Sequence, residues 1–218
     1  MADTCPACRA HLDPQLLRLR TRSGVTAAQW LWAPASGSPH HLVVGPGGCL
    51  VAHPPGGGPS SAVRGLPTAL PVADKSVGTL VVPLLLPVQE DIDGLFSELR
   101  RVLLPHGLLT MLVPTHPSFG FRARRLGREV RAHWRHRSAI DHPDWLAAAA
   151  DFAVLGDDRL TFTLDTGEDA AETTVDRLCA AGLYPPALPI ELRTRVAAHR
   201  AQAGSPPRLA LRRIVTRR

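Results

Sequence analysis

Residues 77–113 (VGTLVVPLLLPVQEDIDGLFSELRRVLLPHGLLTMLV) decide the fold class of this chain. Residues 77–86 are an almost continuous apolar run of strand length, which is typical of a strand covered on both faces. Residues 89–104 place apolar side chains at helical spacing, with acidic residues in the first turn and arginines near the end. A proline and a glycine then stop the helix, and residues 108–113 read as a second buried strand. This order predicts a right-handed parallel unit and an α/β fold.

The last third of the chain continues the alternation of helices and strands. The patterns predict helices over residues 144–152, 169–181 and 191–202. They predict a half-exposed strand over residues 159–165 and a terminal strand over residues 209–215.

Composition excludes several classes of protein. Of the 218 residues, 44% are hydrophobic and 20% are charged, which is typical of a globular chain. No apolar run approaches the roughly 18 residues that cross a bilayer, so we expect no membrane span. Four cysteines suggest an intracellular, cytoplasmic protein and no disulfide scaffold. The net charge is +6, and Lys75 is the only lysine, so arginine supplies nearly all of the positive charge.

Residues 69–114 resemble the second half of class I S-adenosylmethionine-dependent methyltransferases. In that family a segment close to LPFADGSFDAV leads into the fourth strand, and a helix ending ELRRVLRPGG leads into the fifth. The residues that match in order and spacing are Glu98, Leu99, Arg100, Arg101, Val102, Leu103, Pro105 and Gly107. The resemblance implies a Rossmann-like domain over residues 17–218, preceded by a short segment, residues 1–16. It implies a mostly parallel seven-stranded sheet with helices on both faces.

The resemblance also implies an S-adenosylmethionine site in the first half of the chain. Family spacing makes residues 16–20 the first strand, residues 40–44 the second and residues 61–64 the third. The family has an acid near the end of the first strand, then glycines, a second acid that holds the ribose hydroxyls, and an aspartate near the adenine. This chain has other residues at those positions, namely Arg18, Arg20, Arg22, Ser23, Gly24, Gly45 and Leu66.

The predicted cofactor site is therefore eroded. Only Gly24 remains of the first turn, and arginine side chains would fill the space that glycines leave and would repel the sulfonium charge. A second register stays open, in which residues 13–22 form a helix and residues 29–32 form the first strand. Both registers lack the acids.

Cys5, Cys8 and His11 form a C-x2-C-x2-H pattern that could hold zinc. A fourth ligand would come from Cys49, Cys179 or a partner chain. The alternative is a chain terminus with free thiols, and we favour it because no second C-x2-C follows.

Seven arginines lie between two histidines, His116 and His142; they are Arg122, Arg124, Arg125, Arg128, Arg131, Arg135 and Arg137. On a helix, four of them would share a face that could bind RNA phosphates. The alternative is a solvated helix face, which the scarcity of base-stacking aromatic residues favours. His116, which follows the predicted fifth strand, is a weak general-base candidate.

These observations predict a noncatalytic methyltransferase-like protein that serves as a binding or scaffolding subunit with another protein. No residue is predicted to be catalytic, and no cofactor is expected. The alternative is an active enzyme on a small molecule or RNA, which would hold S-adenosylmethionine through backbone groups and Trp30 or Trp32. A third hypothesis is that Arg20 and Arg22 hold an anionic ligand.

Overall fold

The computed structural model describes residues 14–35, 41–45, 49–53, 61–115, 117, 119–120, 123–167 and 169–218. Within this part of the chain one eight-stranded sheet runs in the order β1-β7-β8-β6-β5-β2-β3-β4. The strands are β1 (Leu19–Arg20), β2 (His41–Val44), β3 (Cys49–His53), β4 (Ser61–Arg64), β5 (Val77–Pro83), β6 (Leu103–Pro114), β7 (Ala153–Leu164) and β8 (Arg208–Arg217).

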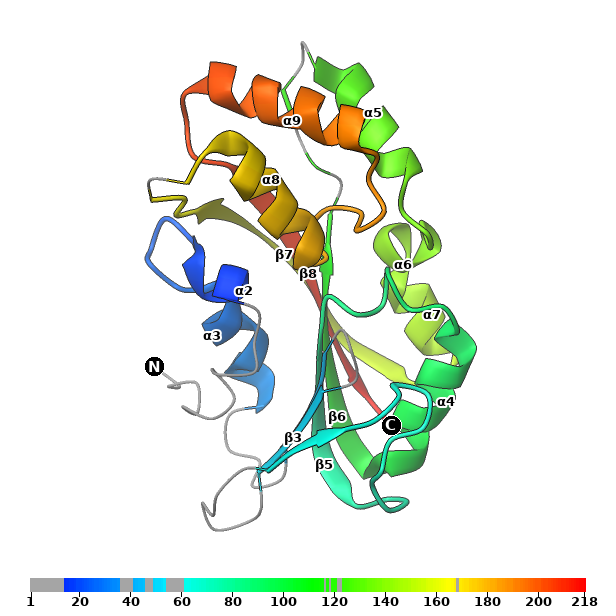
Figure 1. Cartoon of the computed structure of the whole chain (residues 1–218). Helices are drawn as coiled ribbons and strands as arrows, with labels where there is room; N and C mark the ends of the chain where they lie inside the picture. The colour runs from blue at the N-terminus through cyan, green and yellow to red at the C-terminus, as the bar shows by residue number, and fades with distance from the viewer. Residues whose placement is uncertain are drawn as a thin grey trace.

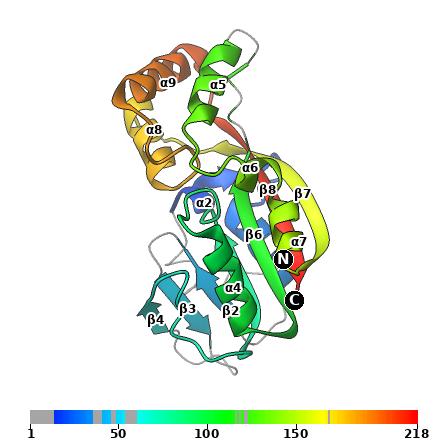
Figure 2. The ribbon, with the colours of Figure 1, turned by 90° about the vertical axis from the view of Figure 1, so that its right-hand side faces the viewer.

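Helices cover both faces of the sheet, as predicted (Figures 1 and 2). On one face lie α4 (Ile92–Val102), α6 (Ser138–Asp141) and α7 (Pro143–Ala149). On the other lie α2 (Pro14–Arg18), α3 (Ala27–Trp32), the short 3-10 helix η1 (Ala33–Ala35), α5 (Arg124–Ala132), α8 (Ala171–Ala180) and α9 (Ile190–Ala203). In the described part of the chain, no helix has both the length and the apolar character that crossing a bilayer requires.

The parallel unit of β5, α4 and β6 forms the centre of the sheet, as predicted. Strands β5 and β6 pair in parallel, with Leu80 opposite Leu109. Side chains of β5 alternate between the two faces, so that Val81 joins one core cluster while Leu80 and Val82 join the other. Helix α4 begins after Asp91, whose side chain accepts a hydrogen bond of 2.7 Å from the backbone N of Gly94.

The α/β, Rossmann-like class is confirmed, and the sheet differs from the prediction in detail. It has eight strands in the described residues, and only the pairs β2/β5 and β5/β6 are parallel. The additional strand, β3, arises because the chain turns back after β2 and pairs with it antiparallel, and β4 then pairs antiparallel with β3.

Both predicted registers of the first strand are wrong. In the first register, residues 16–20 were a central strand, but α2 takes up most of them, and β1 pairs antiparallel with β7 at the edge of the sheet. In the second register, residues 29–32 were a strand, but they lie in α3. The cause is a capping box: the hydroxyl of Thr26 accepts from the backbone N of Gln29 at 3.1 Å, and the Gln29 side chain accepts from the backbone N of Thr26 at 3.0 Å. The first strand that pairs with β5 is therefore β2.

Candidate functional site

The carboxyl ends of β2, β5 and β6 meet at one edge of the sheet, which is where ligands bind in open α/β folds. The described residues at this edge are mostly apolar. After β5 the chain continues through Leu84, Leu85 and Leu86, which are all buried. Among the described residues within three positions after these strands, none carries a titratable side chain.

Gly45 is the predicted ribose-binding position that lies at this edge. It directly follows β2, and a Cβ built on it would meet no atom within 4 Å. It follows the first parallel strand rather than the predicted second one, so its assignment changes. The chain then returns as β3, antiparallel to β2, after residues 45–48. The end of β3 consequently lies at the opposite edge of the sheet, far from the ends of the parallel strands.

Five of the predicted cofactor positions lie in or next to β1, which four other strands of the sheet separate from β2. They are Arg18, Arg20, Arg22, Ser23 and Gly24. Their predicted assignment to the turn after the first central strand is therefore wrong, because β1 is an edge strand that pairs with β7.

Two of these arginines support local structure at the edge of the sheet. The Arg18 guanidinium donates to the Asp169 carboxylate at 2.9 Å, and Arg177 contacts the same carboxylate. The hydrogen bond from Arg18 and the nearby charge of Arg177 lower the pKa of Asp169. Arg20 donates to the backbone O of Gly24 at 3.4 Å within its own turn.

Leu66 stands where the resemblance predicts the aspartate near the adenine. It is 68% exposed and forms an isolated bridge with Ala69. It opens the loop that leads to β5. Close behind it, a Cβ on Gly65 would lie 2.6 Å from the ring of Pro71, so the start of this loop has room only for glycine.

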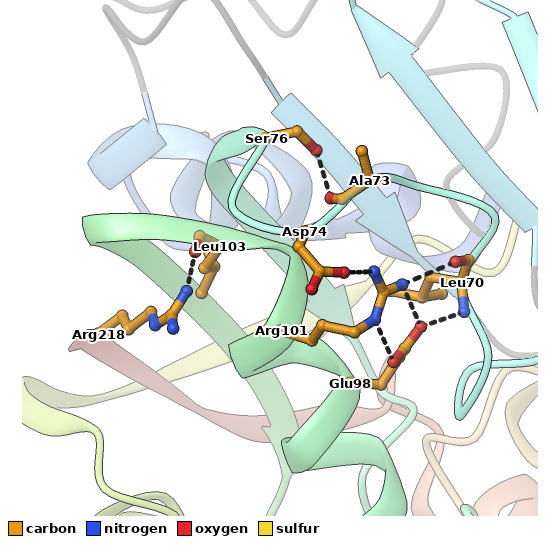
Figure 3. Close-up of polar contacts among 8 residues, drawn as sticks. All are labelled: Leu70, Ala73, Asp74, Ser76, Glu98, Arg101, Leu103 and Arg218. Carbon is orange, nitrogen blue, oxygen red and sulfur yellow. Dashed lines mark hydrogen bonds and ion pairs between the residues drawn. The ribbon is translucent and has the colours of Figure 1, made fainter.

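A clamp formed by Glu98 and Arg101 of α4 holds this same loop (Figure 3). The Glu98 carboxylate accepts from the backbone N of Leu70 at 2.5 Å and from Arg101 at 2.7 and 2.8 Å. Arg101 also donates to the backbone O of Leu70 at 3.0 Å and pairs with Asp74. The hydrogen bond from Arg101 lowers the pKa of Glu98 despite its burial. Two residues of the matched motif therefore fix the loop to the helix.

The loop is tied further at its second half (Figure 3). The hydroxyl of Ser76 donates to the backbone O of Ala73 at 2.7 Å, and the backbone N of Lys75 donates to the backbone O of Arg101 at 2.9 Å. Arg218, the last residue, donates to the backbone O of Leu103 where α4 passes into β6.

Trp30 and Trp32 lie in the core, at 8% and 6% exposure. The Trp30 ring packs against Phe162 with centroids 5.6 Å apart, and the Arg213 guanidinium lies 4.7 Å from its centroid. Arg213 also donates to the backbone O of Trp30 at 2.6 Å. These contacts make Trp30 a packing residue of α3.

The predicted zinc ligands Cys5, Cys8 and His11 lie outside the described residues. Cys179 is buried in α8, and its burial raises the pKa of its thiol to about 11. The described part of the chain holds no cluster of three or more side chains suited to a metal.

Two arginines of the predicted RNA-binding helix face form ion pairs with acidic residues. Helix α5 ends at Ala132, so the shared face does not extend to Arg135. Arg131 pairs with Asp141 at 2.7 Å, and Arg135 pairs with Glu90 at 2.6 Å. Arg122 and His116 lie outside the described residues, and RNA binding stays a prediction.

A hollow of about 420 Å³ lies beside the end of β6, between the start of β8 and α9. Thr115, just after β6, donates from its backbone N and its hydroxyl to the backbone O of Ala210 at 3.0 and 2.9 Å. The basic side chains at this hollow are His199, Arg200 and Arg208. The sequence analysis missed this site, because no sequence pattern links these residues to the end of β6.

Comparisons with known proteins concern the fold. No protein-family model matches the chain, and a search of curated proteins finds no match. A candidate methyltransferase from Bacillus halodurans is 16% identical over 71% of this chain and 70% of that one, with a TM-score of 0.45. The YcgJ protein from Bacillus subtilis is 16% identical over 71% and 68%, with a TM-score of 0.43.

A third similar structure contains a cofactor product. Geranyl diphosphate C-methyltransferase from Streptomyces coelicolor A3(2), in complex with S-adenosyl-L-homocysteine, is 15% identical, with a TM-score of 0.38; the match covers 72% of this chain and 52% of that one. At these identities the site must be judged on this chain's own geometry. That geometry is an α/β, Rossmann-like fold with the parallel unit β5–α4–β6 at the centre of its sheet and helices on both faces.

Proposed function

We propose that this chain is a noncatalytic, methyltransferase-like protein that acts as a binding or scaffolding subunit. The observation that carries the proposal is the antiparallel return of β3 after residues 45–48. A carboxylate that holds ribose hydroxyls must follow a strand whose end lies beside the end of β2. Strand β3, the neighbour of β2 on the side away from β5, ends at the other edge, so among the described strands this neighbour places no carboxyl end beside that of β2.

The character of the strand ends supports the same proposal. S-adenosylmethionine carries two ribose hydroxyls, an amino group and a sulfonium charge, and each needs a polar partner when water is removed. The described residues after β5 are buried leucines, and the hydroxyl of Thr115 after β6 already donates to the backbone O of Ala210. The described residues at these strand ends do not fit the cofactor, which supports a role other than methyl transfer.

Calorimetric titration of the whole chain with S-adenosylmethionine and with S-adenosylhomocysteine tests the proposal. We expect no saturable heat up to about 1 mM of either compound, which corresponds to a binding free energy weaker than about 4 kcal/mol. Circular dichroism on the same sample confirms that the protein is folded. Micromolar affinity for either compound would refute the proposal and favour an active methyltransferase.

The partner of such a subunit is proposed to be another protein that contacts the β7 edge. In the described residues, β1 pairs with only Thr163 and Leu164 of β7, which leaves the rest of this edge unpaired. Leu155, at an irregularity in the pairing of β7 with β8, is 52% exposed, and Trp145 of the adjacent α7 is 70% exposed. An open strand edge with exposed apolar side chains is a common protein contact.

Crosslinking in cells, followed by purification of the tagged chain, tests the partner. We expect Leu155→Glu to lower recovery of the crosslinked protein strongly. Leu66→Glu, at a leucine that is also more than half exposed but lies on another surface, serves as the control and should leave recovery unchanged. Equal recovery with both variants, or recovery of the chain alone, would contradict an interface at this edge.

A further inference from the structure

The hollow beside the end of β6 has an unusual balance of charge. Its described lining includes Arg200, Arg208 and His199, and it includes no carboxylate. Neither arginine forms an ion pair with any described residue, whereas many other arginines of the chain are paired. Two guanidinium groups that face one hollow without a counter-charge raise the local potential and favour an anion there.

Arg200 is held rigidly in this position. Its guanidinium donates to the hydroxyl of Tyr184, which is fully buried, at 2.6 Å, and it lies 5.0 Å from the centroid of the Phe119 ring. Its Nε is buried and has no hydrogen-bond partner among the described residues. The hydrogen bond to Tyr184 and the contact with the Phe119 ring together fix the guanidinium at the hollow.

His199 is fixed beside it by the same aromatic residue. Its Nε2 lies 3.0 Å from the backbone O of Phe119, and the two rings meet edge to face with centroids 5.6 Å apart. Thr161 of β7 and Ser205, just after α9, bring hydroxyl groups to the same hollow.

Arg200 lies between two neighbouring hollows, and their volumes limit the size of the ligand. A second hollow of about 400 Å³ lies between α8 and α9, and it shares Arg200, Ser205 and Pro206 with the first. Its lining also includes Asp169, whose carboxylate is already paired with Arg18 and Arg177. Volumes of this size are typical of sites for small molecules, and they are too small for a folded macromolecule. A phosphate group carries more acceptor oxygens than a single carboxylate, so it can accept from two guanidinium groups and from hydroxyl donors at once.

We infer that this hollow binds the phosphate group of a small molecule, with Arg200 and Arg208 as its principal ligands. Arg200 supplies the fixed donors, and Arg208, the exposed first residue of β8, supplies the second guanidinium at the mouth. The inference goes beyond the proposed function and does not depend on it, because the hollow is lined by residues of β7, β8 and α9 and by Phe119 after β6, and its described lining includes no residue at the ends of β2 and β5.

The test is thermal unfolding of the whole chain in increasing inorganic phosphate, with sodium chloride at matched ionic strength as the reference. We expect a saturable rise in Tm in the millimolar range of phosphate. Arg208→Gln should raise the phosphate concentration for half-maximal effect at least tenfold while leaving Tm without phosphate unchanged, because Arg208 has no ion pair to lose. Arg217→Gln, an exposed arginine at the other end of β8, is the matched control and should behave as wild type.

Several results would overturn the inference. One is a wild-type response no larger than that in sodium chloride, and another is an equal loss of response in Arg208→Gln and Arg217→Gln. Equal stabilisation by acetate and phosphate would contradict the phosphate assignment. None of these readouts involves S-adenosylmethionine, so failure here is distinguishable from failure of the proposed function.

Discussion

Removing one member of the Glu98–Arg101 clamp should destabilise the protein by an amount that a double-mutant cycle can isolate. The Glu98 side chain is only 11% exposed and the Arg101 side chain is 32% exposed, so their hydrogen bonds are only partly screened by water. Hydrogen bonds to charged groups contribute about 1.5–3 kcal/mol each, and Arg101→Gln removes two charged contacts to Glu98 and one to Asp74. Discounting for partial exposure, we expect a loss of about 2–3 kcal/mol.

The assay is urea unfolding of wild type, Glu98→Gln, Arg101→Gln and the double variant at neutral pH. We expect a coupling free energy of at least about 1.5 kcal/mol, because either single substitution already breaks the contact. Arg135→Gln is the control: its pair with Glu90 is 57% and 78% exposed, and its loss should cost less than about 1 kcal/mol. Coupling below about 0.5 kcal/mol would refute the view that this pair holds the loop.

Three further predictions follow from buried or strained positions. In a variant that lacks the other cysteines, Cys179 should resist a thiol reagent at pH 8 until the protein unfolds, because burial raises its pKa to about 11; rapid labelling of the folded protein would contradict this. Hydrogen bonds from Arg212 lower the pKa of Asp157, so the stabilisation is complete above the unfolded pKa of about 3.9 and is lost as pH falls through the lower folded value. The stability gap between wild type and Arg212→Met should therefore narrow from pH 7 to pH 3 in urea unfolding, and a constant gap would count against it. Gly182→Ala should lower stability by about 1–2 kcal/mol, since φ is +72° and a Cβ would lie 3.3 Å from a backbone oxygen; Gly204→Ala, with φ of +60° and open space around it, should cost less, and equal melting temperatures of the two variants would argue otherwise.

The sequence predicted the centre of the sheet well because its signals are local. The apolar run that became β5 and the amphipathic pattern that became α4 each specify one element within a short window. The prediction for the N-terminal region was wrong because the spacing of Leu16, Leu17 and Leu19 fits a short helix as well as a strand. The sequence analysis overlooked one pattern in this region. Thr26 and Gln29 have the spacing of a capping box, which indicates a helix and not a strand over residues 29–32.

The basic hollow could not have been predicted from local patterns. Its contacts join residues that are far apart in the chain, as His199 and Phe119 are separated by 80 positions. Which side chains meet there depends on the register of β8 between β6 and β7, and this register follows from the pairing of three strands at once. Single positions in a sequence carry no such information.

The clamp of Figure 3 gives two residues of the matched motif a structural role that does not depend on a cofactor. Glu98 and Arg101 contact the loop before β5, and none of their hydrogen bonds in the described structure requires a ligand. A chain that lost the cofactor would still need these two residues, because their side chains hold the first half of the loop against α4. The carboxylates that hold a cofactor, by contrast, have no packing role that would keep them in place. A sequence can therefore preserve the motif of residues 98–107 and lose the acids at its strand ends, which is the combination that the proposed function requires of this chain.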